Sequence, residues 1–293
     1  MAVRSTQHTS VRNSRAVYPR TRRIRFRFNE EAGRKYFVAG DMVFSHFVAG
    51  LSGAFPPGEE GFIRSVRRFA DRITDPDLKR RVAGFIGQES MHGQEHRHLN
   101  EKLIAMGYPI AWWDSESFKD KRIRFEDRLP ARVHLALTAA AEHYTAVLAE
   151  RVLSSDELQS IPADPEVWHL LNWHALEELE HKSVAFDVYR AVGGTERTRI
   201  GVMVAACTLL LPVTLVSLAL SVGSDPVARR RPVRLARETY DLFTGPIFKG
   251  LVPDLAVYLR PGFHPDDVDT NALAQQWRDT LFGADGILVD HLR

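Results

Sequence analysis

Two short runs constrain the fold of this chain more than any other feature: Glu89-Ser-Met-His92 and Glu178-Leu-Glu-His181. In each run a carboxylate precedes an imidazole by three residues, so on a helix both side chains lie on one face, about one turn apart. Two such pairs on separate helices, completed by one carboxylate from each of two further helices, make the ligand set of a dinuclear metal site in a four-helix bundle. The long segment between the runs leaves room for such a bundle.

The pattern of proline, glycine and apolar residues predicts a mainly helical chain. The expected helices cover residues 31–51, 59–73, 76–106, 131–153, 165–192, 228–260 and 270–282. The expected connections are a turn at Phe55-Pro-Pro-Gly58, a polar and aromatic segment over 111–128, and a short strand or extended lead-in over Ile24–Phe28. No strand–helix alternation, glycine-rich phosphate loop or internal repeat appears. The predicted fold class is therefore all-α, with a four-helix bundle over 29–195 and additional C-terminal helices over 196–293, one of them long and apolar.

A third histidine accompanies each pair. His96 follows Glu89 and His92, and His174 precedes Glu178 in the mirrored order. At about 100° per residue, each triplet spans an arc of roughly 60°, so its members can face one point. Large apolar residues border both triplets, and buried carboxylates and imidazoles must be paired or metal-bound. Ionised carboxylates and neutral imidazoles are donors that hard or borderline divalent metals accept.

The remaining two helices should each supply one carboxylate. Glu142 is the acid in the middle of the 131–153 helix, among small apolar residues. It either bridges metal ions or pairs with a Lys or Arg in the core, and we favour the metal. On the 59–73 helix Glu59 and Glu60 compete, and we favour Glu59 because it projects with the apolar side of that helix. The predicted ligands are Glu59, Glu89, His92, Glu142, Glu178 and His181.

Four other residues are candidates for supporting roles at this site. His96 and His174 either bind metal or orient the ligands by hydrogen bonds, and we favour orientation. Glu177 could replace Glu178 as a ligand, but Glu178 has the three-residue spacing to its histidine. Tyr144 flanks a predicted ligand and could donate an electron if it lies near an iron centre.

Four runs resemble the motifs of a known family. They are Phe55-Pro-Pro-Gly-Glu59, Gln88-Glu-Ser-Met-His92 with His96 and Asn100, Trp173-His-Ala-Leu-Glu-Glu-Leu-Glu-His181-Lys-Ser-Val-Ala-Phe-Asp187, and Tyr258-Leu-Arg-Pro-Gly-Phe-His264-Pro. They are similar to those of a widespread bacterial family, the predicted metal-dependent hydrolases, over nearly the whole chain after its basic N-terminus. The resemblance implies a ferritin-like helical core. It also strengthens the choice of Glu59, because a Gly-Glu pair after Phe-Pro-x belongs to the family's pattern.

The charge distribution separates a basic arm from a mildly acidic body. Residues 1–28 hold eight arginines and no acidic residue, although the whole chain carries only +2. We expect a disordered arm rather than a transit peptide, and no nucleic-acid partner. A single cysteine, Cys207, excludes an internal disulfide and fits the reducing cytoplasm. The N-terminus lacks the apolar stretch of a secretory signal.

An uncharged apolar segment over 200–222 is long enough to span a bilayer. Pro212 interrupts it, and arginines flank both ends, at Arg199 and at 229–231, so the charge bias gives no orientation. The segment either associates with the membrane from its inner face, as a spanning or re-entrant segment, or is buried against the bundle or in a homodimer, and burial is slightly favoured. His264, in a Pro-Gly-Phe-His-Pro loop, either caps a helix or reaches the site.

Three functions remain open. We place O2-dependent oxidation of a small or lipophilic substrate at a di-iron site first, because four carboxylates and two imidazoles suit iron redox cycling. The alternative is a metal-dependent hydrolase that uses a metal-activated bridging water, with manganese or zinc as other candidate metals. The third is a non-catalytic metal-binding protein. No flavin or nicotinamide motif is present, so oxidation would require a separate electron donor protein.

Overall fold

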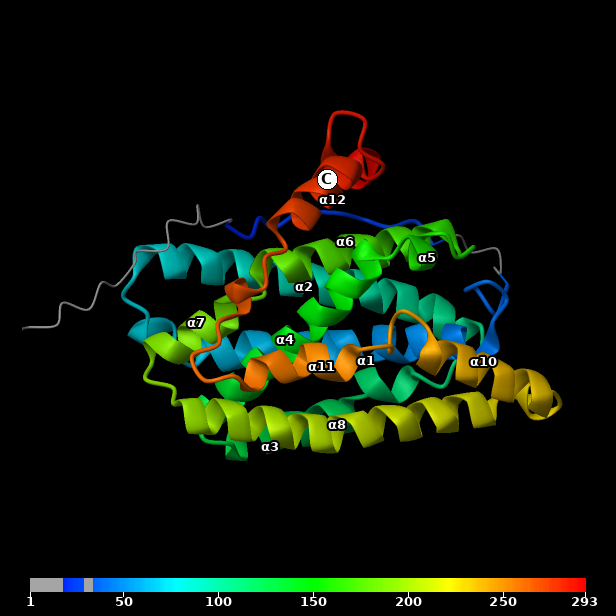
Figure 1. The fold of residues 1–293 in the computed structure, drawn as a ribbon, viewed down its shortest axis with the longest axis horizontal. Coiled ribbons are helices and arrows are strands. Elements are labelled where there is room, and N and C mark those ends of the chain that lie inside the picture. Colours follow the sequence, from blue (N-terminus) through cyan, green and yellow to red (C-terminus); the bar gives the residue numbers. More distant parts are fainter. Residues whose placement is uncertain (1–17, 29–33) are drawn as a thin grey trace, which may run out of the picture.

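The computed structural model describes residues 18–28 and 34–293, and over these residues the fold is all-α, as the sequence predicts (Figure 1). The core is a bundle of four helices: α1 (Met42–Arg67), α2 (Pro76–Ala105), α4 (Ala131–Ser154) and α6 (Pro165–His181). Helix α1 packs against α2 and α4, and α6 packs against the same two helices. Within the described residues extended pairing is limited to the isolated bridges Ile24–Leu292 and Val38–Ala163. The more specific ferritin-like assignment stays a prediction.

Two of the core helices start where the sequence predicts. Asp75 caps α2 by accepting the backbone N–H groups of Asp77 and Leu78, and Pro76 occupies the first turn. Asp164 caps α6 in the same way, again followed by a proline. An aspartate cap satisfies N–H groups that have no partner within the helix, and proline has no N–H to lose there. These caps fix where the two helices that carry Glu-x-x-His begin.

The predicted turn at Phe55–Gly58 is wrong. Helix α1 continues through Pro56 and Pro57, so the expected helices over 31–51 and 59–73 form one element that begins only at Met42. Proline at position 56 cannot donate to the carbonyl of Ser52, but the side-chain amide of Asn100 on α2 donates to that carbonyl instead, at 3.0 Å. A tertiary contact therefore compensates for the bond that the proline removes.

Other boundaries also differ from the prediction. The segment over 111–128, expected as a connection, contains η2 (Ala111–Asp114) and α3 (Glu116–Arg128). Helix α3 has little apolar surface, and the ion pair between Arg122 and Glu126, one turn apart, supports it. The expected helix over 165–192 is divided into α6 and α7 (Val184–Ala191). The expected helix over 228–260 is divided because Pro232 starts a new helix and Gly250 adopts a left-handed φ of 79°. Its parts are α9 (Pro226–Arg229), α10 (Pro232–Thr244), α11 (Leu251–Ala256) and η3 (Val257–Leu259).

Short elements complete the chain around the bundle. They are η1 (Ala70–Arg72), α5 (Asp156–Gln159), η4 (Pro265–Asp267), α12 (Asn271–Phe282) and η5 (Val289–His291). Of these, α12 agrees with the helix predicted over 270–282.

Part of the N-terminal arm packs on the bundle. The sequence predicts a disordered arm over 1–28, but residues 18–28 lie against the core, whereas 1–17 fall outside the described residues. Ile24 and Phe26 are fully buried, and the Phe26 ring lies 5.5 Å from that of Trp173 on α6. The alternation of apolar residues that suggested a strand therefore gives this extended segment one face that packs on α6.

The long apolar helix is α8 (Glu196–Ser224), which packs along α1 and α4 (Figure 1). Asp225, at its C-terminal end, is buried and contacts Lys35 Nζ at 2.9 Å, Tyr36 Oη at 2.9 Å and His46 Nε2 at 3.3 Å. Burial raises the pKa of Asp225, but the hydrogen bonds, led by that from Lys35, outweigh it and hold the pKa below its ordinary value of 3.8. This carboxylate joins α8 to α1 and to the segment before α1.

Replacing Asp225 with asparagine tests this attachment. Because the folded pKa lies below the unfolded one, the ionised carboxylate stabilises the fold above about pH 4, and this contribution is lost on further acidification. We expect Asp225→Asn to lower the free energy of unfolding at neutral pH by about 2 kcal/mol. The variant should also lose part of the acid dependence of stability, measured by urea unfolding at several pH values. Asp285→Asn, which changes an exposed carboxylate, is the control and should match the wild type.

Candidate metal centre

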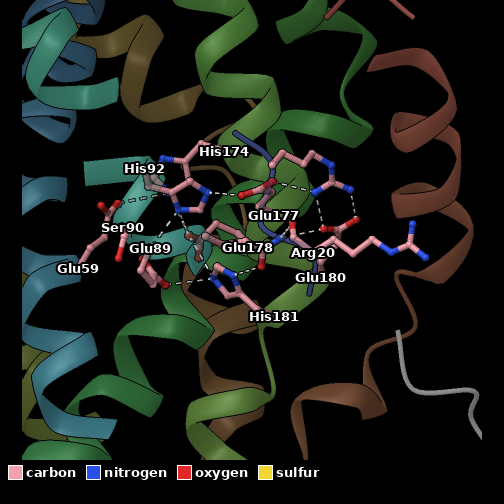
Figure 2. Close-up of polar contacts among 12 residues, drawn as sticks. Arg20, Glu59, Glu89, Ser90, His92, His174, Glu177, Glu178, Glu180 and His181 are labelled. Carbon is pink, nitrogen blue, oxygen red and sulfur yellow. Dashed lines mark hydrogen bonds and ion pairs between the residues drawn. The ribbon is translucent and has the colours of Figure 1, made fainter. Parts of the chain in front are cut away.

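The structure brings the six predicted ligands together in the middle of the bundle. Glu59 comes from α1, Glu89 and His92 from α2, Glu142 from α4, and Glu178 and His181 from α6. Each of these residues is at most 4% exposed. Figure 2 shows most of them directed toward one another, from helices on different sides of the cluster.

Glu89 and Glu178 lie between the two predicted imidazole ligands. His181 Nε2 is 3.3 Å from Glu89 Oε1 and 3.5 Å from Glu178 Oε1. On the other side, His92 Nδ1 is 3.8 Å from Glu89 Oε2 and 3.8 Å from Glu178 Oε1. Both carboxylates, one from each Glu-x-x-His run, are therefore placed to be shared between two cations.

The other two carboxylates lie at opposite ends of this arrangement. Glu142 Oε2 is 3.3 Å from His181 Nε2. Glu59 lies near His92 and His174, with ligand atoms of all three within 4.8 Å of one another. The cluster thus has two overlapping groups of donors, one around each predicted imidazole ligand, which is the arrangement that a pair of cations requires.

Most of the inward-facing atoms have no hydrogen-bond partner. Among the described residues, these are both carboxylate oxygens of Glu59, Glu89 and Glu142, together with His92 Nδ1 and His181 Nε2. A buried polar atom without a partner is costly, and most are satisfied in native structures. Divalent cations would satisfy all of these atoms at once, so the residues present fit a metal centre.

Electrostatics lead to the same conclusion. Burial, followed by repulsion from neighbouring carboxylates, raises the pKa of Glu59 and Glu89 well above the ordinary value, and burial raises that of Glu142 to about 7. Burial lowers the pKa of His92, so its imidazole is neutral, whereas Glu178 and Glu142 raise the pKa of His181. The cluster without metal therefore retains protons that bound cations would displace.

A hydrogen bond fixes the outer nitrogen of each predicted imidazole ligand. His92 Nε2 donates to Glu177 Oε2 at 3.0 Å, so Nδ1 faces the cluster. His181 Nδ1 donates to Gln88 Oε1 at 3.0 Å, so Nε2 faces the cluster. Such outer contacts set the tautomer and orientation of metal-binding histidines. Glu177 therefore lies outside the donor cluster, next to the predicted ligand Glu178.

One arginine of the N-terminal arm supports both of these contacts. Arg22 Nη1 lies 2.8 Å from Glu177 Oε1 and 2.7 Å from Glu180 Oε2. Glu180 in turn accepts a hydrogen bond from Gln88 Nε2 at 2.9 Å. Sequence reasoning missed Arg22 and Gln88, because neither is a typical ligand. For Gln88 the sequence offered a signal, because this residue lies directly before Glu89 and opens the motif run Gln88-Glu-Ser-Met-His92.

His96 and His174 lie next to the cluster, and His174 forms a possible donor group with Glu59 and His92, so the choice between ligand and supporting residue stays a prediction. His96 Nε2 lies 2.7 Å from His174 Nδ1, and His174 Nε2 lies 2.9 Å from Glu178 Oε1. Glu178 also accepts a hydrogen bond from Thr145, a residue that sequence reasoning did not consider. His174 Nε2 is also 3.6 Å from Glu59 Oε1, so it lies at the edge of the donor group as well.

Two other candidates lie elsewhere. Tyr144 packs among apolar side chains, and it approaches Cys207 on α8 rather than the carboxylate cluster. His264 caps η4, and its Nε2 donates to Asp187 Oδ1 at 2.8 Å. Of the two roles considered for His264, the structure shows the cap.

An apolar cavity of about 90 Å³ borders the cluster. It is reached between α1, α4 and α6, and His174, Glu178 and Thr145 form its polar wall. The remaining lining is apolar and includes Phe44, Phe47, Leu51, Phe55, Leu148 and Trp168.

The fold and the donor set define a helical-bundle protein with a candidate metal-binding interior. The chain belongs to the family described as predicted metal-dependent hydrolases, whose model matches residues 20–269. This match confirms the resemblance that the motifs suggest, and it covers every predicted ligand. No curated protein and no solved structure matches the chain.

Removing a ligand at either end of the cluster tests the centre itself. We expect Glu142→Ala and His181→Ala to bind metal at least tenfold more weakly, because each leaves an incomplete donor group. Metal content of purified protein, measured by mass spectrometry of the elements, provides the readout. Glu150→Ala on α4, which belongs to none of the possible donor groups, is the control. Unchanged metal content in both cluster variants would show that the assignment is wrong.

Replacing Arg22 tests the support from the arm. Loss of its guanidinium leaves Glu177 without its arginine and leaves Glu180 only Arg278, so the residues that orient the two imidazoles are held less firmly. We expect Arg22→Met to weaken metal affinity by roughly 10- to 100-fold, measured by competition with a chelator. Arg23→Met, an exposed neighbour in the same arm, should bind metal as the wild type does. Equal affinities in all three proteins would remove Arg22 from the site.

Proposed function

We propose that this protein is a hydrolase that acts at a pair of divalent cations in the bundle interior. The observation that carries the proposal is the set of unpartnered oxygens and nitrogens on Glu59, Glu89, Glu142, His92 and His181. The family description supports hydrolysis over the oxidation that sequence analysis placed first. Cations held by these residues and Glu178 would polarise the scissile bond and lower the pKa of water.

His174 is the residue best placed to handle a proton beside the cations. Its ring lines the apolar cavity, and its Nε2 faces Glu178 and Glu59. Its Nδ1 is held by His96, whose other ring nitrogen lies 2.9 Å from Ser52 Oγ. This chain of contacts fixes the orientation of the His174 imidazole. We assign to His174 the transfer of a proton to or from the substrate.

The cavity indicates an apolar substrate. Aromatic and aliphatic side chains form nearly all of its wall, and its polar atoms are concentrated at His174, Glu178 and Thr145. An apolar group held there would exclude water from one side of the cluster and direct its polar end toward the carboxylates. A carboxylic ester with an alkyl chain has this chemistry.

Oxidation at an iron pair is the second candidate. The observation in its favour is the donor set itself, since one Glu from each of two helices and Glu-x-x-His from two others is the pattern of di-iron carboxylate bundles. This function would require iron and a separate electron donor. Manganese and zinc are compatible with hydrolysis. A purely structural metal would leave the adjoining cavity without a role.

Metal-substituted enzyme separates these functions. We expect protein loaded with zinc or manganese to hydrolyse nitrophenyl esters of alkyl acids equally well in air and without oxygen, because water rather than O2 is the co-substrate. Glu142→Ala should lose this activity. Leu148→Trp, which fills the cavity, should retain metal but act at least tenfold more slowly on longer esters. Activity that requires iron, O2 and a reductant would instead establish oxidation.

A further inference from the structure

Helix α8 carries its apolar side chains on the outside of the protein. No charged residue occurs from position 200 to 224. The outward face includes Leu209, Val216 and Leu220, which are 66%, 57% and 69% exposed. Only 6% of its most apolar stretch is buried. A surface helix of a water-soluble protein shows the reverse arrangement, with its apolar stripe toward the core.

The inward side of α8 mixes apolar and polar side chains, and Met203 and Val222 are its apolar residues with the least exposure, 2% and 5%. Ser221, on the side that packs against α1, is 8% exposed, and its Oγ lies 2.7 Å from His46 Nδ1. Thr214 and Ser217 are half-buried, in contrast to the exposed leucines and valines around them. The large apolar side chains of α8 are thus mostly on its outward side, and an exposed apolar face of this length needs an apolar cover.

A buried arginine holds the N-terminal end of α8 on the protein. Arg199 is completely buried, and its guanidinium donates to the carbonyls of Tyr258 and Arg260. It also pairs with Glu196 at 2.7 Å and lies over the Tyr258 ring. Separating a buried charge from its partners is strongly unfavourable. This end of the helix therefore stays attached.

The C-terminal end is held in the same way by Asp225, which contacts Lys35, Tyr36 and His46. With both ends fixed, α8 lies lengthwise against the bundle, as Figure 1 shows. It cannot turn across a bilayer without breaking two buried polar networks. Any lipid contact must therefore be made along the side of the helix.

The residues that follow α8 supply positive charge. Arg229, Arg230 and Arg231 are exposed. Val233 and Tyr240 on α10 add exposed apolar surface nearby, at 84% and 68%. Basic residues beside an exposed apolar helix match the chemistry of anionic lipid headgroups above acyl chains.

We propose that α8 lies in the plane of an anionic membrane, with its outer face among the acyl chains and Arg229–Arg231 at the headgroups. The breadth of the apolar face favours lipid over a second copy of the chain. Leu211 and Val213, both exposed, belong to an apolar arc of roughly 200° around the helix. A partner helix covers only a narrower stripe. This proposal is independent of the reaction at the metal centre.

Vesicle flotation tests the surface. Wild-type protein should float with vesicles of phosphatidylcholine and phosphatidylglycerol and bind pure phosphatidylcholine much more weakly. Leu209→Gln/Val216→Gln/Leu220→Gln should reduce binding at least tenfold, because it removes apolar contact with the acyl chains. The matched control Ile104→Gln/Val252→Gln/Ile287→Gln changes exposed apolar residues elsewhere and should bind normally. Circular dichroism verifies that each variant is folded.

Charge reversal tests the arginines. Arg229→Glu/Arg230→Glu/Arg231→Glu should weaken binding to the anionic vesicles by roughly a hundredfold or more, since each basic residue near such a surface contributes to attraction. Arg67→Glu/Arg72→Glu/Lys79→Glu, also exposed, is the control and should have a much smaller effect.

The single cysteine reports the depth of α8. Cys207 is exposed on this helix, so it can carry an environment-sensitive fluorophore. We expect quenching by nitroxides near the headgroups rather than at the bilayer centre, because an in-plane helix enters only about 5–10 Å. In a spanning helix Cys207 would lie about 12 Å beyond Arg199, close to the midplane.

Three outcomes would overturn the proposal. Preferential quenching at the bilayer centre would indicate a spanning helix. Failure to bind vesicles, together with a dimer that the triple glutamine variant dissociates, would assign the face to a second copy. Undiminished vesicle binding by the triple glutamine variant would place the lipid contact elsewhere.

Discussion

The structure depends on one unfavourable arrangement: four carboxylates and two imidazoles meet inside the bundle with most of their inward atoms unpaired. Like charges in a buried space repel, and each unsatisfied atom adds to the free-energy cost. Four helices must be held together against that cost until cations offset it. The caps of α2 and α6, the apolar packing around the cluster and the hydrogen bonds outside it all serve this purpose.

The support extends well beyond the bundle. Arg22 reaches Glu177 and Glu180 from the N-terminal arm, and through them and Gln88 it affects both predicted imidazole ligands. A segment that the sequence assigns to a disordered arm thus belongs to the outer part of the metal centre. Its place in the fold follows from the burial of Ile24 and Phe26, which brings Arg22 to α6.

Helix α8 packs on the outside of the bundle, and its apolar side chains are directed differently from those of the core helices. Helix α8 packs both polar and apolar side chains on the bundle and directs most of its large apolar groups toward the surroundings, yet buried charges hold it at both ends. Both the apolar cavity beside Glu178 and the apolar face of α8 favour contact with apolar molecules. In the proposals made above, the protein acts on an apolar substrate and works at a lipid surface.

The sequence by itself determined the all-α class, the starts of α2 and α6, and which carboxylates and histidines meet. These features depend on local rules, because a cap acts within one turn and a three-residue spacing fixes a helix face. Only the tertiary structure decided the course of α1 through Pro56, where Asn100 supplies the missing donor. It also decided the roles of Arg22 and Gln88 and the outward direction of α8. Each of these depends on a contact with residues distant in the chain, and the local spacing of residues does not predict such contacts.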